Sequence, residues 1–143
     1  MAADALHFRF IVDGENFTSA GEASVEVKKK LRQLGFAPEV IRRVSIAMYE
    51  GEINMVIHAN GGEITVDITP ECIIMQLQDI GPGIADIDKA MQAGYSTAPD
   101  QVRSLGFGAG MGLPNMKKNS DTMDIQTVLG QGTTVTMTVN MPE

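Results

Sequence analysis

Hydrophobic and polar residues follow two different periods along this chain, and together they predict a mixture of strands and helices. From Leu6 to Val12 bulky apolar residues occupy every second position, which is typical of a half-buried strand. The segments 17–34 and 37–59 carry apolar residues at helical spacing. Gly35 ends the first predicted helix, and Asn60-Gly61-Gly62 ends the second.

The rest of the chain predicts four more strands and two more helices. The strands are expected at 63–68, 73–78, 123–128 and 133–139, with a short helix at 87–93 and another helix beginning near Met111 or Gly112. The order β-α-α-β-β-α-α-β-β lacks the regular strand–helix alternation of a parallel sheet. We therefore expect one α+β domain over residues 1–143, a two-layer α/β sandwich with a mixed, mostly antiparallel sheet.

Charge and composition narrow the function classes. The net charge of −7 argues against direct nucleic-acid binding, and the basic cluster Lys28-Lys29-Lys30 with Arg32 is interpreted as a solvated helix face. No apolar run approaches the roughly 18 residues of a membrane span, and no charged-then-apolar leader opens the sequence. The lone Cys72 excludes an internal disulfide and a cysteine zinc site, so we expect a cytoplasmic protein.

Three segments carry candidate chemistry, and the first lies on the second predicted helix. Glu50, Asn54 and His58 are spaced i, i+4 and i+8, which places them on one stripe of that helix. A carboxylate and an amide oxygen side by side suit a hard cation such as Mg²⁺. The alternative is an ordinary solvent face.

The second and third segments are rich in glycine. Asp79-Ile80-Gly81-Pro82-Gly83 follows a strand, so its carboxylate can accept from an exocyclic amine of a base, although a plain turn has the same pattern. The run 106–112 leads into a helix, and its backbone N–H groups suit a polyphosphate unless the run is a flexible hinge. No Gly-Lys-Ser/Thr follows, which excludes a Walker loop. The polar stretch 94–110 before it is predicted to be a mobile lid.

The order of these segments from Leu6 to Met141 resembles the GHKL ATPase superfamily, which has the Bergerat fold with helices on one face of the sheet. The superfamily includes gyrase-type, Hsp90-type, sensor-histidine-kinase and MutL-type ATP domains. The resemblance implies that ATP and Mg²⁺ are bound, with Asn54 coordinating the metal and Glu50 acting as general base. For His58 a role in capping or packing the helix end is the favoured interpretation.

The resemblance also implies contacts to the nucleotide itself. Asp79 would accept the adenine amine, Gly81 and Gly83 would belong to the same loop with Gly83 against the base, and Thr133 would act through Asp79 and a water. The phosphates would lie on the backbone of Gly108, Gly110, Met111 and Gly112. For Arg103 two interpretations stay open: contact with the γ-phosphate or a partner, and a solvated position in the lid.

Within the superfamily the chain is most similar to the small bacterial anti-sigma factors and switch-protein serine kinases. It has no room for transduction domains, and neither His7 nor His58 fits a phospho-accepting histidine. The resemblance implies a homodimeric kinase that phosphorylates a STAS-domain antagonist and controls a sigma factor. The alternatives are a nucleotide-gated module that sequesters a sigma factor, and a weak stand-alone ATPase.

Three features depart from the family pattern. Gly51 replaces the alanine usual after the helix glutamate, and a glycine inside a helix costs about 1 kcal/mol. Glu52 adds a second acid beside Glu50, which leaves two candidates for the base. Extra residues around 104–108 leave the contacts of the predicted lid open.

Overall fold

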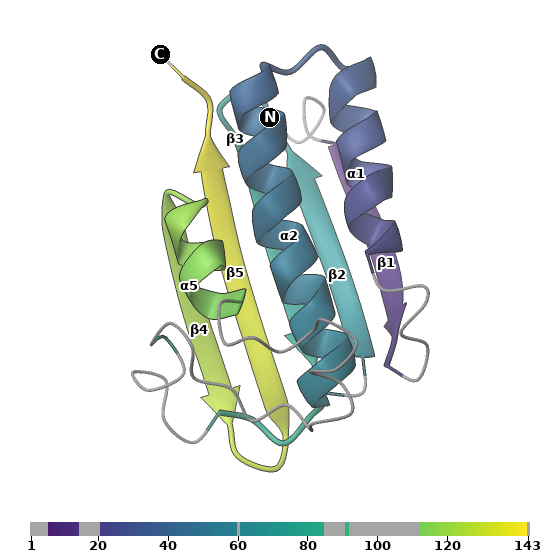
Figure 1. Ribbon diagram of the computed structural model, residues 1–143, viewed down its shortest axis with the longest axis vertical. Helices are drawn as coiled ribbons and strands as arrows, with labels where there is room; N and C mark the ends of the chain where they lie inside the picture. The colour runs from purple at the N-terminus through teal and green to yellow at the C-terminus, as the bar shows by residue number, and fades with distance from the viewer. Residues whose placement is uncertain (1–5, 15–20, 60, 85–90, 92–111, 143) are drawn as a thin grey trace.

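The computed structural model describes residues 6–14, 21–59, 61–84, 91 and 112–142, with the side chains of residues 58 and 59 excepted. In Figure 1 three helices lie across one face of a twisted sheet. The helices are α1 (Glu22–Gln33), α2 (Pro38–Ala59) and α5 (Gly112–Lys118). The strands are β1 (Leu6–Asp13), β2 (Gly61–Ile68), β3 (Cys72–Asp79), β4 (Thr122–Val128) and β5 (Gly132–Asn140).

The five strands form one sheet in the order β1-β2-β3-β5-β4. Each of the four pairings is antiparallel: Leu6 faces Ile68 across β1 and β2, and Cys72 faces Asn140 across β3 and β5. The predicted α+β sandwich is therefore confirmed. Within the described residues the sheet has no parallel pair, which makes it more regular than the mixed sheet expected from the sequence.

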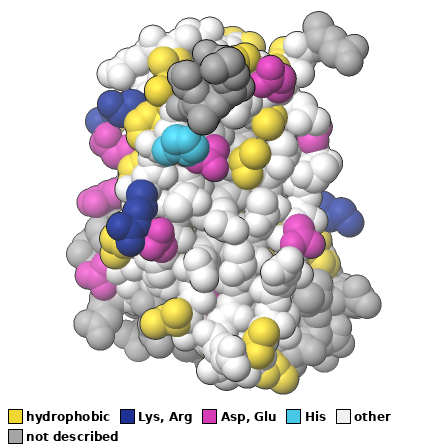
Figure 2. Space-filling model, turned by 180° about the vertical axis from the view of Figure 1, so that it is seen from behind, with side chains coloured by type: hydrophobic (Ala, Val, Ile, Leu, Met, Phe, Trp, Pro, Cys, Tyr) yellow, Lys and Arg dark blue, Asp and Glu magenta, His cyan; other side chains and the backbone are white. Residues whose placement is uncertain are grey.

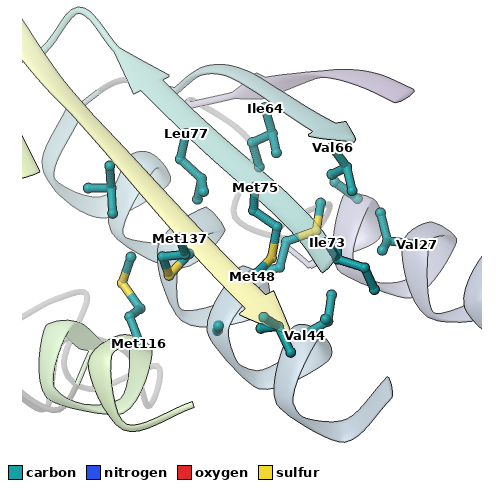
Figure 3. Close-up of a cluster of buried hydrophobic side chains, with 14 of the residues drawn as sticks. Val27, Val44, Met48, Ile64, Val66, Ile73, Met75, Leu77, Met116 and Met137 are labelled. Carbon is teal, nitrogen blue, oxygen red and sulfur yellow. The ribbon is translucent and has the colours of Figure 1, made fainter. Parts of the chain in front are cut away.

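The core lies between the helices and the inner face of the sheet. Alternate residues of the three central strands point inward, and α2 contributes the other side of the contact (Figure 3). The side chains with less than 2% exposure are mainly aliphatic residues and methionines, namely Leu31, Met48, Ile64, Ile73, Met75, Met116, Met137, Val27, Val44, Val66 and Val139. Several of the ten methionines therefore serve as core residues that adapt to irregular gaps.

The opposite face of the sheet is polar. Figure 2 shows it largely free of charged side chains in the centre, with charges towards its edges. His7 pairs with Asp67 and Arg9 with Glu63, each across β1 and β2. Both pairs are exposed and therefore add little stability.

Most predicted elements are found within a few residues of their expected bounds. The first helix begins at Glu22, and residues 17–20 of its predicted range lie outside the described part. The predicted short helix at 87–93, apart from residue 91, and the predicted lid at 94–110 also lie outside it. In the part of the chain that the structure describes, no helix is long and apolar enough to cross a membrane.

Candidate functional site

The C-terminal half of α2 carries the first part of the candidate site. Pro38 and Glu39 favour the start of this helix, since proline suits the first helical position and an acidic residue complements the helix dipole. Asn54 is half-buried against the first residue of α5. A Cβ atom added to Gly112 would lie 2.8 Å from Nδ2 and 2.9 Å from Oδ1 of Asn54, so only glycine leaves this amide in place.

Glu50 is half-buried one turn before Asn54 and faces the same neighbouring helix. Asn115, on α5, is close enough to the Glu50 carboxylate to affect its pKa. Burial raises the pKa of Glu50 above its ordinary value, and Asn115 opposes that rise. A carboxylate of this kind is suited to accept a proton. Asn115 is not among the site residues predicted from the sequence.

Glu52 has a different surrounding from Glu50. Its side chain is only 3% exposed, and its two oxygens accept four hydrogen bonds from the start of α1. Oε2 accepts from the N–H groups of Gly21 and Ala23, and Oε1 from the N–H and hydroxyl of Ser24. α1 has no side-chain cap from its own Gly21, so Glu52 caps it from another helix. Glu52 therefore has a structural role, and of the two acids Glu50 remains the candidate base.

The end of β3 and the start of β5 form the second part of the candidate site. Oδ1 of Asp79 accepts the backbone N–H groups of Thr133 and Gly81, each at 3.0 Å. The hydroxyl of buried Thr133 lies 2.9 Å from that of Thr127 on β4. The two N–H bonds to Oδ1 hold the Asp79 carboxylate in a defined orientation. In this orientation the carboxylate can accept a hydrogen bond from a ligand amine.

Two glycines allow the loop after β3 to pack against the turn between β4 and β5. Gly83 has φ +82°, and an added Cβ would lie 2.8 Å from the carbonyl oxygen of Val128. Gly132 has φ +143°, and an added Cβ would lie 2.2 Å from the carbonyl oxygen of Asp79. Both positions therefore need glycine for conformation and for space.

The two parts of the site lie at the same end of the molecule (Figure 1). Gly62 connects them, because an added Cβ there would lie 2.8 Å from Cε of Met55 on α2 and 2.9 Å from Cα of Asp79. Glu50, Asn54 and Gly112 therefore meet where α2 contacts α5, and the predicted residues Asp79, Gly81, Gly83 and Thr133 meet nearby at the sheet end.

Four predicted site residues lie outside the described residues: Arg103, Gly108, Gly110 and Met111. The side chain of His58 is also outside them. Among the described residues, no three His, Cys, Asp or Glu side chains gather where they would hold a metal ion by themselves. Any cation at Asn54 would therefore take most of its ligands from outside the described residues.

The sequence comparisons agree with this geometry. Residues 39–143 match the family model described as histidine kinase-, DNA gyrase B-, and HSP90-like ATPase. The serine/threonine-protein kinase RsbT of Bacillus subtilis is 32% identical over 108 residues, covering 73% of this chain and 75% of that protein. The anti-sigma F factor of Clostridium acetobutylicum is 30% identical over 142 residues, covering 96% of this chain and 94% of that protein.

Solved structures support the same fold. A crystal structure of the RsbU and RsbW domains of a Mycobacterium tuberculosis protein matches 95% of this chain with a TM-score of 0.59 and 16% identity. This chain covers 32% of that longer one. The mycobacterial sensor histidine kinase MprB matches 95% of this chain with a TM-score of 0.53. The chain belongs to the histidine kinase-, gyrase- and HSP90-like (GHKL) ATPase family, in the partner-switching branch that contains the anti-sigma F factors and RsbT.

Proposed function

We propose that this protein binds ATP and acts as a serine/threonine kinase in a partner-switching module. Its substrate would be a hydroxyl on a STAS-domain anti-anti-sigma protein, and the protein would work as a cytoplasmic homodimer. The names of its relatives, a serine/threonine kinase and anti-sigma F factors, support this regulatory class.

The observation that supports the kinase most directly is the environment of Glu50. Its carboxylate is half-buried, its pKa is raised by burial, and Glu52 is occupied by the start of α1. In the proposed reaction the substrate hydroxyl oxygen forms a bond to the γ-phosphorus of ATP. The bond from that phosphorus to the β–γ bridging oxygen breaks, ADP leaves, and the hydroxyl proton moves to Glu50.

Asn54 would hold Mg²⁺ through its amide oxygen. A single protein oxygen fits this ion, since Mg²⁺ commonly keeps waters and phosphate oxygens as its other ligands. The glycine at position 112 leaves space beside that amide which any Cβ would fill. When bound, Mg²⁺ would neutralise charge on the phosphates.

Asp79 would select adenine. Its Oδ1 is already oriented by Thr133 and Gly81, so the carboxylate can accept the exocyclic amine without reorganising. Gly108, Gly110, Met111 and Arg103 stay proposed phosphate contacts from the sequence pattern.

A second candidate is a nucleotide-gated module that sequesters a sigma factor without transferring phosphate. The similarity to anti-sigma F factors over 96% of this chain favours it. The two candidates share the ATP site and differ in whether Glu50 is needed for the function.

The test is to mix the purified chain with Mg-ATP and a STAS-domain protein from the same genome, and to measure the partner's intact mass. A gain of one phosphate that is lost in Glu50→Ala supports the kinase, provided that calorimetry shows ATP binding retained in this variant. Asp79→Asn should lose both binding and transfer, while Asp124→Asn, on the exposed polar face, should keep both. No gain with wild type, despite ATP binding, would contradict the kinase and leave the sequestration module.

A further inference from the structure

Three side chains form a row across the end of the sheet, from β4 at its edge to β3 (Figure 1). The hydroxyls of Thr127 on β4 and Thr133 on β5 are 2.9 Å apart, and these two residues pair across the strands. The backbone N–H of Thr133 donates to Oδ1 of Asp79 at 3.0 Å. Thr133 shares its face of β5 with the core residues Val135 and Met137, so the row lies on the side of the sheet that carries the helices.

The contacts of Thr127 decide which way the hydroxyl protons of this row point. Its Oγ1 accepts the backbone N–H of Ile84 at 2.8 Å, and that N–H can only donate. The proton of Thr127 then has two acceptors within reach: Oγ1 of Thr133 at 2.9 Å and the carbonyl oxygen of Gly132 at 3.4 Å. Hydrogen bonds from a hydroxyl to an oxygen are normally about 2.5–3.0 Å long, so the bond to Thr133 is favoured.

The opposite direction is a poorer arrangement. If Thr133 donated to Thr127, the proton of Thr127 would have only the long contact to Gly132 among the described residues. With Thr127 as the donor, Thr133 receives a hydrogen bond and keeps its own proton for a ligand. Each bond in such a row polarises the next, which makes the Thr133 hydroxyl a stronger donor.

A donor beside an acceptor matches the edge of one kind of base. The carboxylate of Asp79 is the acceptor, and no described residue donates a hydrogen bond to its Oδ2. Adenine presents an exocyclic amine, which donates, beside a ring nitrogen, which accepts. Guanine has a carbonyl oxygen in place of that amine and would meet Asp79 with a second acceptor. A site whose polar groups have fixed directions rejects such a mismatch.

We propose that Thr127 is a positioning residue that sets the base specificity of the nucleotide site, because it directs the Thr133 hydroxyl to donate beside the accepting carboxylate of Asp79. This inference rests on the proposed function, since it takes Asp79 as the acceptor of the adenine amine. Thr127 acts through Thr133 and does not itself contact the base.

The binding test compares Thr127→Val, which has the same shape but no hydroxyl, with wild type. Competition against a fluorescent ATP analogue gives the dissociation constants of Mg-ATP and Mg-GTP. We expect ATP to bind about tenfold more weakly and GTP to change by less than about twofold, because only ATP uses the directed donor. Thr127→Ser keeps the hydroxyl and should restore the wild-type preference. Equal weakening of both nucleotides, or of neither, would overturn the proposal.

Thr69→Val is the matched control for the loss of a bonded hydroxyl. Thr69 lies in the turn before β3, at the opposite end of that strand from Asp79, and its Oγ1 bonds to the backbone of Glu71 and Cys72. This variant should lose stability without changing either dissociation constant. A loss of ATP binding as large as that of Thr127→Val would mean that general destabilisation is the cause, and would overturn the proposal.

A second measurement needs no ligand. Amide hydrogen exchange at Ile84 should be at least about fivefold faster in Thr127→Val than in wild type, and unchanged in Thr127→Ser. Thr127→Ala replaces Thr127→Val in both experiments if the latter does not fold. Unchanged exchange at Ile84, in a variant that binds ATP as wild type does, would overturn the role of Thr127. If wild type binds no ATP, the proposed function itself is contradicted.

Discussion

Glu50 and Glu52 lie two positions apart on α2, and their carboxylates face different helices. Asn115 of α5 influences the pKa of Glu50, whereas Gly21, Ala23 and Ser24 at the start of α1 donate hydrogen bonds to Glu52. Two residues correspond to about 200° around a helix, which explains the opposite directions. One turn of α2 therefore combines a candidate base with a buried cap for its neighbour.

Glu52→Ala should destabilise the protein by about 2–4 kcal/mol, because it leaves three backbone N–H groups and one hydroxyl without their acceptor. Urea unfolding followed by circular dichroism measures the change. Glu26→Ala on α1 is the control: it breaks an exposed pair with Lys29 at 3.6 Å and should stay within about 0.5 kcal/mol. Equal effects of the two substitutions would contradict the capping role of Glu52.

Gly51 lies where α2 crosses β3 and α5 closely. An added Cβ would lie 2.3 Å from Cδ2 of Leu77 and 3.2 Å from Cε of Met116. Gly51→Ala should therefore destabilise the protein by about 1–2 kcal/mol, since the steric cost in a packed core exceeds the gain of about 1 kcal/mol in helix propensity. Thermal or urea unfolding of wild type and variant measures this change in the free energy of unfolding.

The companion experiment introduces the same change into a Leu77→Ala background. With the obstructing side chain removed, only the propensity term remains, so Gly51→Ala should become neutral or stabilising by up to about 1 kcal/mol. If the cost is unchanged there, contact with Leu77 is not its cause.

Glu50→Gln should stabilise the protein at neutral pH and lose this advantage in acid. Burial raises the folded pKa of Glu50 above the ordinary 4.5, so the native state binds its proton more tightly than the unfolded chain. The stabilisation that protonated Glu50 contributes is fully present below the ordinary pKa of 4.5. It is lost as the pH rises through the raised pKa of the folded state. Melting temperatures of wild type and variant, measured from pH 4 to pH 8, should diverge as pH rises.

Glu39 provides a control of opposite sign. Its hydrogen bond from Arg42 lowers its folded pKa, so its contribution is present above the unfolded value and is lost as pH falls. Glu39→Gln should therefore give a small loss at neutral pH, reduced further because the pair is exposed to solvent. A pH-independent difference for Glu50→Gln would mean that burial does not perturb this carboxylate.

Sequence patterns predicted the elements well because alternation and helical spacing are local properties. In the strand at 133–139, inward residues such as Val135 and Met137 alternate with threonines. The alternation of apolar and polar residues is therefore enough to predict which face of this strand lies in the core. The stripe of Glu50 and Asn54 and the loop after Asp79 also follow from spacing, and the structure brings the two to one end of the molecule.

The partners of these residues depend on which helices pack together, which no local pattern specifies. Asn115 meets Glu50 only because α5 folds onto α2 after a long intervening segment. Glu52 left a usable signal: it is four residues after Met48 and three before Met55, within an apolar stripe. A carboxylate in such a stripe is buried and must find donors, which would have removed it as a candidate base.

The contact between Gly112 and Asn54 leads to a prediction about magnesium. Gly112→Ala would place a methyl group 2.8–2.9 Å from the amide atoms of Asn54 and force that side chain to move. We expect Mg-ATP binding to weaken about tenfold or more, corresponding to about 1.4 kcal/mol, with little change in binding measured in EDTA. Calorimetry with and without Mg²⁺ gives both values.

Unfolding does not account for the expected loss, because alanine favours a helix more than glycine does and no positive φ is recorded at Gly112. Lys117→Ala, an exposed change on the same helix, is the matched control and should bind Mg-ATP as wild type does. If Gly112→Ala keeps the full dependence on Mg²⁺, Asn54 either tolerates the displacement or does not hold the ion. Asn54→Ala then decides between these two, since only a ligand's removal abolishes the Mg²⁺ dependence.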